Sequence, residues 1–150
     1  MKKIFYLFLA IFTFISCAED EIVYNDAAVQ ALKNYEPWKA TTFKAVVNST
    51  NSVKLTASDS KEELTLNVAS KNVGTYPLGT SSANTVIFKE VTETATTFYT
   101  TGGDWGSGEI KITKNDTSKR TITGSFYYTA TSLAGKSLTM EYGVFYNVPY

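Results

Sequence analysis

The chain has 150 residues, with 14 acidic and 14 basic side chains, one cysteine and no histidine. Without histidine it lacks the usual general base of catalytic triads and the commonest zinc ligand. A single cysteine excludes an internal disulfide. The balanced charge gives no indication of nucleic acid as a partner.

The first seventeen residues have the layout of a secretory signal. Two lysines precede an apolar run over residues 4–15, and a serine and the cysteine follow it. This run is too short to cross a bilayer as a helix. The segment Phe14-Ile15-Ser16-Cys17 resembles the lipobox of bacterial lipoproteins. That resemblance implies removal of residues 1–16, a lipid on Cys17 and attachment to the outer membrane through it.

An acidic leader is expected over residues 17–36. Glu19, Asp20 and Glu21 follow Cys17 directly, and they resemble the export tag of surface-exposed lipoproteins of the Bacteroidetes. The alternative is a solvated spacer, because like charge keeps such a segment away from an anionic membrane.

Within the leader, residues 22–34 place Ile22, Val29 and Leu32 among alanines. This spacing predicts a short helix that ends before Pro37.

The remainder, residues 37–150, is predicted to be an all-β domain. Short runs rich in threonine, valine and aromatic residues alternate with polar turns. They predict strands at 42–47, 53–57, 63–68, 74–79, 85–89, 96–101, 109–113, 120–129 and 137–147. Because the connections are short, we expect an antiparallel sheet, either a β-sandwich or a flattened up-and-down barrel of about eight or nine strands.

Three residues refine this expectation. Pro77 cannot donate to a central ladder, so 74–79 is predicted to be an edge strand. Gly124 and Gly143 lie inside predicted strands, which indicates bulges or close approaches of two backbones.

Residues 102–108 (GGDWGSG) predict a hairpin loop that needs positive φ angles. Asp104 and Trp105 in this loop form a candidate binding site, since an indole on a glycine-rich segment presents a flat apolar face to a sugar ring or a protein partner. The alternative for Trp105 is that it caps the open end of the core.

Carboxylates are the remaining candidates for catalysis. Asp104 and Glu109 flank the loop, Glu62 begins a strand beside Glu63, and Glu90 and Glu93 lie near a bend. A glycosidase needs two acids that converge across a cleft, and the sequence does not show convergence. We therefore assign no catalytic residue, metal ligand or cofactor, and a carboxylate-dependent hydrolase stays a minor alternative.

Several segments resemble a known family. They are GTYPL at 74–78, GEIKITKND at 108–116, KRTITGSF at 119–126 and GVFYNVPY at 143–150. Together they resemble an uncharacterised family of small Bacteroidetes lipoproteins, catalogued as a domain of unknown function (DUF6252), over residues 38–150. The resemblance implies a β-rich domain on a lipid anchor and supplies no catalytic residues.

The expected function is therefore that of a lipid-anchored, surface-exposed outer-membrane module without enzymatic activity. Its expected partner is a glycan or another envelope protein. A structural or protective lipoprotein, such as an assembly accessory or an immunity factor, is the alternative.

Overall fold

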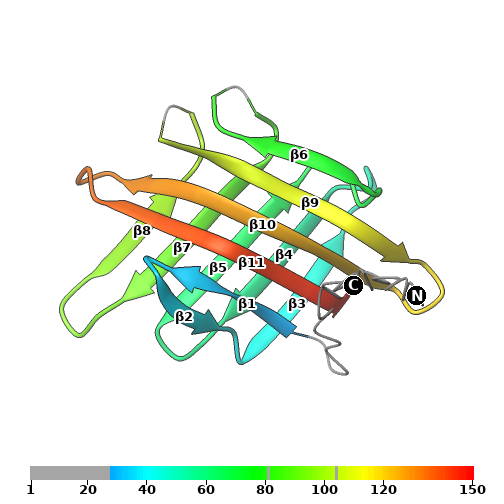
Figure 1. Ribbon diagram of the computed structural model, residues 1–150, viewed down its shortest axis with the longest axis horizontal. Helices are drawn as coiled ribbons and strands as arrows, with labels where there is room; N and C mark the ends of the chain where they lie inside the picture. The colour runs from blue at the N-terminus through cyan, green and yellow to red at the C-terminus, as the bar shows by residue number, and fades with distance from the viewer. Residues whose placement is uncertain (1–27, 81, 104) are drawn as a thin grey trace, which may run out of the picture.

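The computed structural model describes residues 28–80, 82–103 and 105–150, so Cys17, Glu19, Asp20, Glu21 and Asp104 lie outside the described residues. The described chain is all strand and turn (Figure 1), and it contains no helix that could span a membrane. The strands are β1 (Ala28–Lys33), β2 (Glu36–Lys39), β3 (Thr42–Val47), β4 (Val53–Ser58), β5 (Glu62–Val68), β6 (Gly74–Leu78), β7 (Thr85–Val91), β8 (Thr96–Thr100), β9 (Gly106–Asp116), β10 (Thr121–Ser132) and β11 (Ser137–Pro149).

All strand pairs are antiparallel, and one hydrogen-bonded path runs β2-β1-β11-β10-β8-β7-β5-β4-β3. β9 pairs with β10 and carries β6 on its other side. The path ends at β2 and β3, which follow one another in the chain, so the sheet is curled rather than closed by hydrogen bonds.

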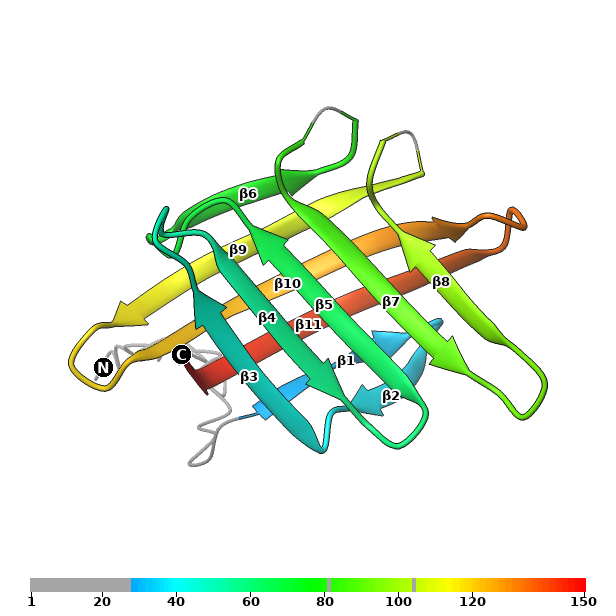
Figure 2. The same cartoon turned by 180° about the vertical axis from the view of Figure 1, so that it is seen from behind.

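β10 divides the sheet into two layers. Its residues 121–130 pair with β9, and only Thr131 and Ser132 pair with β8, opposite Thr100 and Tyr99. The sheet bends there, and the strands of the two layers cross steeply (Figures 1 and 2). β6, β9, β10, β11, β1 and β2 form one layer, and β8, β7, β5, β4 and β3 form the other. This arrangement combines the two packed layers of a sandwich with the curled path of a barrel.

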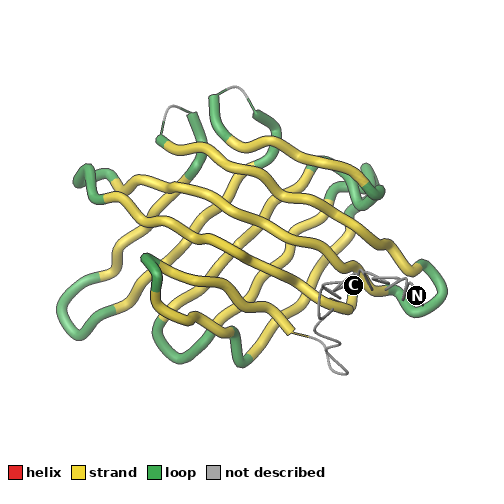
Figure 3. Tube along the Cα trace, in the orientation of Figure 1, coloured by secondary structure: helices red, strands yellow, loops and turns green. Residues whose placement is uncertain are grey.

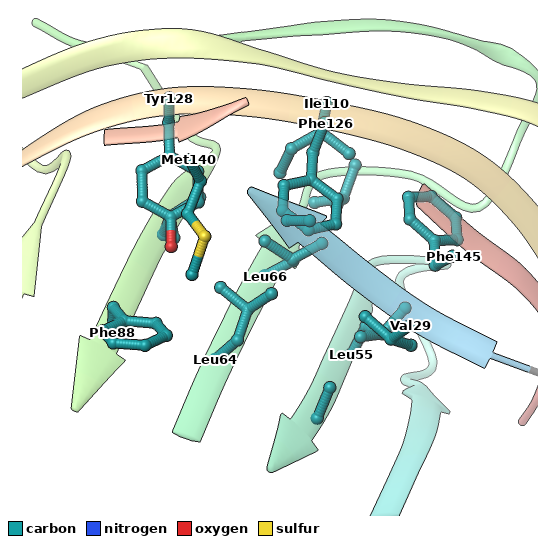
Figure 4. Packing of buried hydrophobic residues seen from close by; sticks show 14 of the residues in the cluster. Val29, Leu55, Leu64, Leu66, Phe88, Ile110, Phe126, Tyr128, Met140 and Phe145 are labelled. Atoms are coloured by element: carbon teal, nitrogen blue, oxygen red, sulfur yellow. The ribbon is translucent and has the colours of Figure 1, made fainter. Parts of the chain in front are cut away.

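The hydrophobic core fills the space between the layers. Figure 4 shows side chains of β10, β11 and β1 pointing toward those of β4, β5 and β7. The largest fully buried side chains come from both layers, and they are Tyr128, Phe88, Phe145, Leu55, Leu64, Leu66, Ile110, Ile112, Ile122, Leu138, Met140 and Val29. Alternate residues of each strand therefore face outward, as period-two patterning requires.

Gly124 and Gly143 behave as predicted. A Cβ atom on Gly143 would clash with the ring of Phe126, and one on Gly124 would clash with the carbonyl of Lys111 and the ring of Phe145. Both glycines also adjoin register shifts between β10 and β11. Each therefore leaves room for an aromatic core side chain beside a bulge.

The nine predicted strands are confirmed, and so is the edge position of β6, which pairs with β9 alone. Tube colouring by secondary structure shows the turns at the rim of the two layers (Figure 3). β9 begins at Gly106 rather than at Glu109, so Gly106–Gly108 belong to a strand and not to the predicted loop. A Cβ on Gly106 or Gly108 would clash with the backbone of β10, so these glycines serve close strand pairing.

The helix predicted over residues 22–34 is wrong where the structure describes it. Ala28–Lys33 is β1, which pairs with β11 on one side and β2 on the other. The prediction contained neither β1 nor β2. A short alanine-containing helix is marginal in water, whereas pairing on both sides satisfies the backbone of β1. The sheet therefore includes residues ahead of the predicted domain start at residue 37.

Candidate functional site

Two tyrosines stand on the outer face of the β10–β11 layer. Tyr127 is 53% exposed and Tyr142 is 81% exposed. Tyr127 points outward because its neighbours Phe126 and Tyr128 both face the core. The alternation that buries two aromatic rings therefore exposes the third.

Tyr142 is held by a bulge in a left-handed backbone conformation. Its φ is +51°. The register passes from Tyr128↔Met140 to Phe126↔Gly143, so Glu141 and Tyr142 together oppose Tyr127. This conformation costs roughly 1–2 kcal/mol for a residue with a Cβ, and a strained backbone that persists is often found at a functional site.

A second bulge of β11 lies opposite Thr123 and provides a comparison. There the left-handed residue is Asn147, with φ +49°, and its backbone N–H donates to Thr123 Oγ1 over 3.0 Å. Asparagine is the residue type that tolerates this conformation outside glycine. The two bulges thus share a backbone geometry, and only one of them presents a large aromatic ring to solvent.

Shallow grooves on this layer meet at the two tyrosines. One groove of 680 Å³ is lined by Gln30, Ala31, Leu32, Pro37, Trp38, Lys39, Tyr142 and Val144. A second, of 350 Å³, runs between Tyr142 and Tyr127 beside Ser125 and Glu141. A third, also of 350 Å³, continues from Tyr127 past Thr129 to Ser107, Gly108 and Leu78.

We call the surface formed by Tyr127, Tyr142 and these grooves the tyrosine face. It crosses β2, β1, β11, β10 and β9, which at the usual strand spacing is a track of roughly 19 Å. The grooves are lined by apolar and polar side chains together, so this face can offer both stacking and hydrogen bonding to an extended ligand.

The predicted binding loop lies at one end of this track. Trp105 is 40% exposed and does not belong to the buried core cluster, so it does not cap the core. Gly103 has φ +63°, as expected for a hairpin loop. Asp104 lies outside the described residues, and ligand binding by this loop stays a prediction.

A separate polar cluster joins the two layers where β1 ends, beside the start of β5 and the end of β7. The ammonium of Lys33 on β1 donates to Glu62 of β5 and, over 3.1 Å, to Glu90 of β7. The same nitrogen lies 5.7 Å from the centre of the Phe88 ring. We call Lys33, Glu62 and Glu90 the lysine–glutamate cluster.

Burial and ion pairing shift the pKa values of Lys33 and of two neighbouring tyrosines. Burial opposes the charge of Lys33, but its hydrogen bonds to Glu62 and Glu90 outweigh that effect and raise its pKa above the usual value. Burial and the nearby Glu90 raise the pKa of Tyr99. Burial also raises the pKa of Tyr128 far above that of a free phenol.

Two buried donors near this cluster have no hydrogen-bond partner in the described structure, namely Trp38 Nε1 and the hydroxyl of Tyr128. The Trp38 ring packs edge-on against Phe88, with 5.9 Å between the ring centres. An unpaired buried donor costs about 1–3 kcal/mol. The core at this end therefore leaves two buried donors without hydrogen bonds, although its apolar side chains are well packed.

Of the carboxylates proposed for hydrolysis, the structure brings together Glu62 and Glu90, which are neighbours in register on β5 and β7. They share one ammonium, so the arrangement acts as an ion-paired bridge between layers. Glu63 and Glu93 are exposed, and Glu109 lies on β9 opposite Tyr127. Across residues 28–80, 82–103 and 105–150, no three side chains of a metal-binding kind gather at one place.

Sequence reasoning missed both tyrosines and the lysine–glutamate cluster. The exposure of Tyr127 could have been predicted, because this residue alternates with two core aromatics in a predicted strand. Tyr142 required knowledge of the bulge, and Lys33, Glu62 and Glu90 are distant in sequence and meet only after the sheet folds.

Comparison with protein families gives a match to the model described as Domain of unknown function (DUF6252), over residues 25–149. The chain therefore belongs to that family, as its sequence segments predicted, and the match includes β1 and β2. Neither the curated proteins nor the solved structures give a significant match.

Proposed function

We propose that this member of the DUF6252 family is a lipid-anchored lipoprotein of the outer membrane, exposed at the cell surface, and that it binds oligosaccharides on the tyrosine face without catalysing a reaction. The observation that carries the binding proposal is the exposed ring of Tyr142 on a strained backbone. The anchor is supported by the signal layout and lipobox that end at Cys17.

A sugar chain suits the tyrosine face for three reasons. Flat aromatic rings bury apolar area at a small entropic cost and keep a polar tip. Gln30, Glu141 and Thr129 line the grooves beside the rings and supply hydrogen-bonding groups for hydroxyls. The track also crosses several strands, so it fits an extended ligand better than a single small molecule.

The binding proposal is tested by replacing Tyr142 and measuring affinity on an array of oligosaccharides. We expect Tyr142→Ala to weaken binding at least tenfold, as for the loss of a central aromatic anchor. Tyr35→Ala is the matched control, because Tyr35 is also exposed, at 78%, and also has a positive φ, at +71°, but it lies in the β1–β2 turn. Tyr127→Ala should reproduce the loss.

Equal affinities for wild type and Tyr142→Ala would contradict this assignment. If Trp105→Ala alone removed binding, the site would be the β8–β9 loop instead. If the protein bound envelope proteins and no oligosaccharide, and this binding depended on Tyr142, the tyrosine face would remain the binding site but its partner would be a protein.

The anchor is tested separately by metabolic labelling with a fatty-acid analogue. Cys17→Ala should abolish the label and leave the precursor uncleaved. Cys17 is the only cysteine, so the label has one thiol to follow. Label that persists in Cys17→Ala would refute lipidation at this residue.

A further inference from the structure

Four cationic side chains gather at the end of the molecule where β9, β10 and β11 meet the β5–β6 loop. Lys71 Nζ lies 5.6 Å and the Arg120 guanidinium 5.8 Å from the centre of the Tyr150 ring. Lys114 lies near the end of β9, and Lys119 lies in the β9–β10 turn beside them. We call Lys71, Lys114, Lys119 and Arg120 the basic end.

One acidic side chain accompanies these four cations in the described part of the chain, and it is already engaged. Asp116 accepts hydrogen bonds from the Ser118 hydroxyl over 2.7 Å and from the Lys119 backbone N–H over 3.0 Å. It lies 3.9 Å from Lys114 Nζ. These hydrogen bonds and the nearby lysines lower the pKa of Asp116. Three of the cations are exposed, so the basic end keeps a net positive surface.

The opposite end carries the acids. Glu36, Asp59, Glu62, Glu63, Glu90 and Glu93 lie on or beside the turns there. Lys33, Lys61 and Lys89 lie among these acids, so this end has a net negative charge and the basic end a net positive one, although the chain as a whole is neutral.

The chain enters the sheet at the basic end. Ala28, the first residue of β1, pairs with Tyr146, only four residues before Tyr150. That separation is roughly 13 Å along a strand. Residues 18–27 are ten in number, and ten residues reach at most about 35 Å. A lipid on Cys17 would thus leave the basic end within reach of the lipid headgroups.

We propose that the basic end rests against anionic lipid headgroups and orients the domain on the membrane. This inference builds on the lipid anchor of the proposed function. A basic patch adds electrostatic attraction to the hold that a lipid anchor provides. Each cation near an anionic surface strengthens association several-fold. Tyr150, between Lys71 and Arg120, has the amphipathic side chain that favours the headgroup level.

The test uses the mature chain with Cys17→Ala, so that the lipid does not contribute. We would measure its flotation at low ionic strength with vesicles of phosphatidylcholine, with or without phosphatidylglycerol. We expect binding only when phosphatidylglycerol is present, and its loss in high salt. The variant Lys114→Gln/Lys119→Gln/Arg120→Gln should bind at least tenfold less.

The matched control is Lys61→Gln/Lys89→Gln/Lys136→Gln, which removes the same charge from turns and strands at the other end and should leave binding unchanged. Equal flotation of both triple variants, or none by the parent chain, would overturn the proposal. Binding that appears only after Glu19, Asp20 and Glu21 are changed to glutamine would assign the basic end to the chain's own leader, and would also overturn it. Lipidation is read independently from the mass of the wild-type protein, so failure of the anchor and failure of this inference are distinguishable.

Discussion

The two ends of the sheet use the same contact for different purposes. Lys33 lies 5.7 Å from the Phe88 ring centre and Lys71 lies 5.6 Å from that of Tyr150. Lys33 also binds two carboxylates from the facing layer, whereas Lys71 shares the Tyr150 ring with Arg120. The same cation–ring pair therefore helps to fasten the layers at one end and helps to hold positive charge on the surface at the other.

The largest effect expected from this comparison follows removal of Lys33. Lys33→Met leaves Glu62 and Glu90 facing each other, and we expect the free energy of unfolding to fall by about 2 kcal/mol, a value reduced from that of a fully buried pair because the cluster is partly solvated. Lys71→Met should cost less, about 0.5 kcal/mol, because Lys71 is only partly buried and a cation–ring contact at such a site contributes about that much. Urea unfolding of the two variants measures both.

A rescue experiment sharpens the result. Replacing Glu62 and Glu90 by glutamine in the Lys33→Met background should recover part of the loss, since the carboxylate repulsion is gone. If Lys71→Met destabilises the protein as much as Lys33→Met, the two ends do not differ in the way described.

A smaller effect is expected from pH. The pKa values of Lys33, Tyr99 and Tyr128 are all raised in the folded protein. Their contributions to stability are therefore complete below the ordinary values, about 10 for tyrosine and 10.4 for lysine, and are lost as pH rises through the folded values. At the basic end the pH dependence of stability has the opposite sign. The pKa of Asp116 is lowered in the folded protein, so its contribution to stability is lost as pH falls.

Urea unfolding across the alkaline range measures this loss. Tyr128→Phe should reduce the alkaline loss of stability. In the wild type the Tyr128 hydroxyl ionises at lower pH in the unfolded chain than in the folded protein, which favours unfolding, and phenylalanine has no such group. Tyr127→Phe, on the outer face, is the neighbouring control for the loss of one tyrosine hydroxyl. An identical alkaline loss in wild type and Tyr128→Phe would show that the buried hydroxyl does not contribute.

Much of the fold was predictable because each strand from β3 to β11 carries its own signal. Leu64, Leu66 and Val68 alternate with polar residues, and Pro77 marks an edge. β1 was missed because its alanines suit a helix in isolation, and its strand conformation depends on β11, which lies far away in sequence.

The candidate site was less predictable than the fold. Trp105 was selected for its glycine-rich setting, yet the exposed ring with the strained backbone is Tyr142. Its position depends on a bulge beside Gly143, whose missing Cβ leaves room for the ring of Phe126. Such a residue is defined by the pairing of two strands, which a single sequence does not display.

The unpaired borders of this sheet also bear on how neighbouring copies behave. β2 carries Pro37, β6 carries Pro77, and β3 carries Lys44 at its centre. A proline offers no N–H to a foreign strand, and a charge on a border strand opposes such pairing. If the chain is tethered as proposed, copies would collide at high local density in two dimensions. These three residues would then oppose edge-to-edge strand pairing between adjacent molecules.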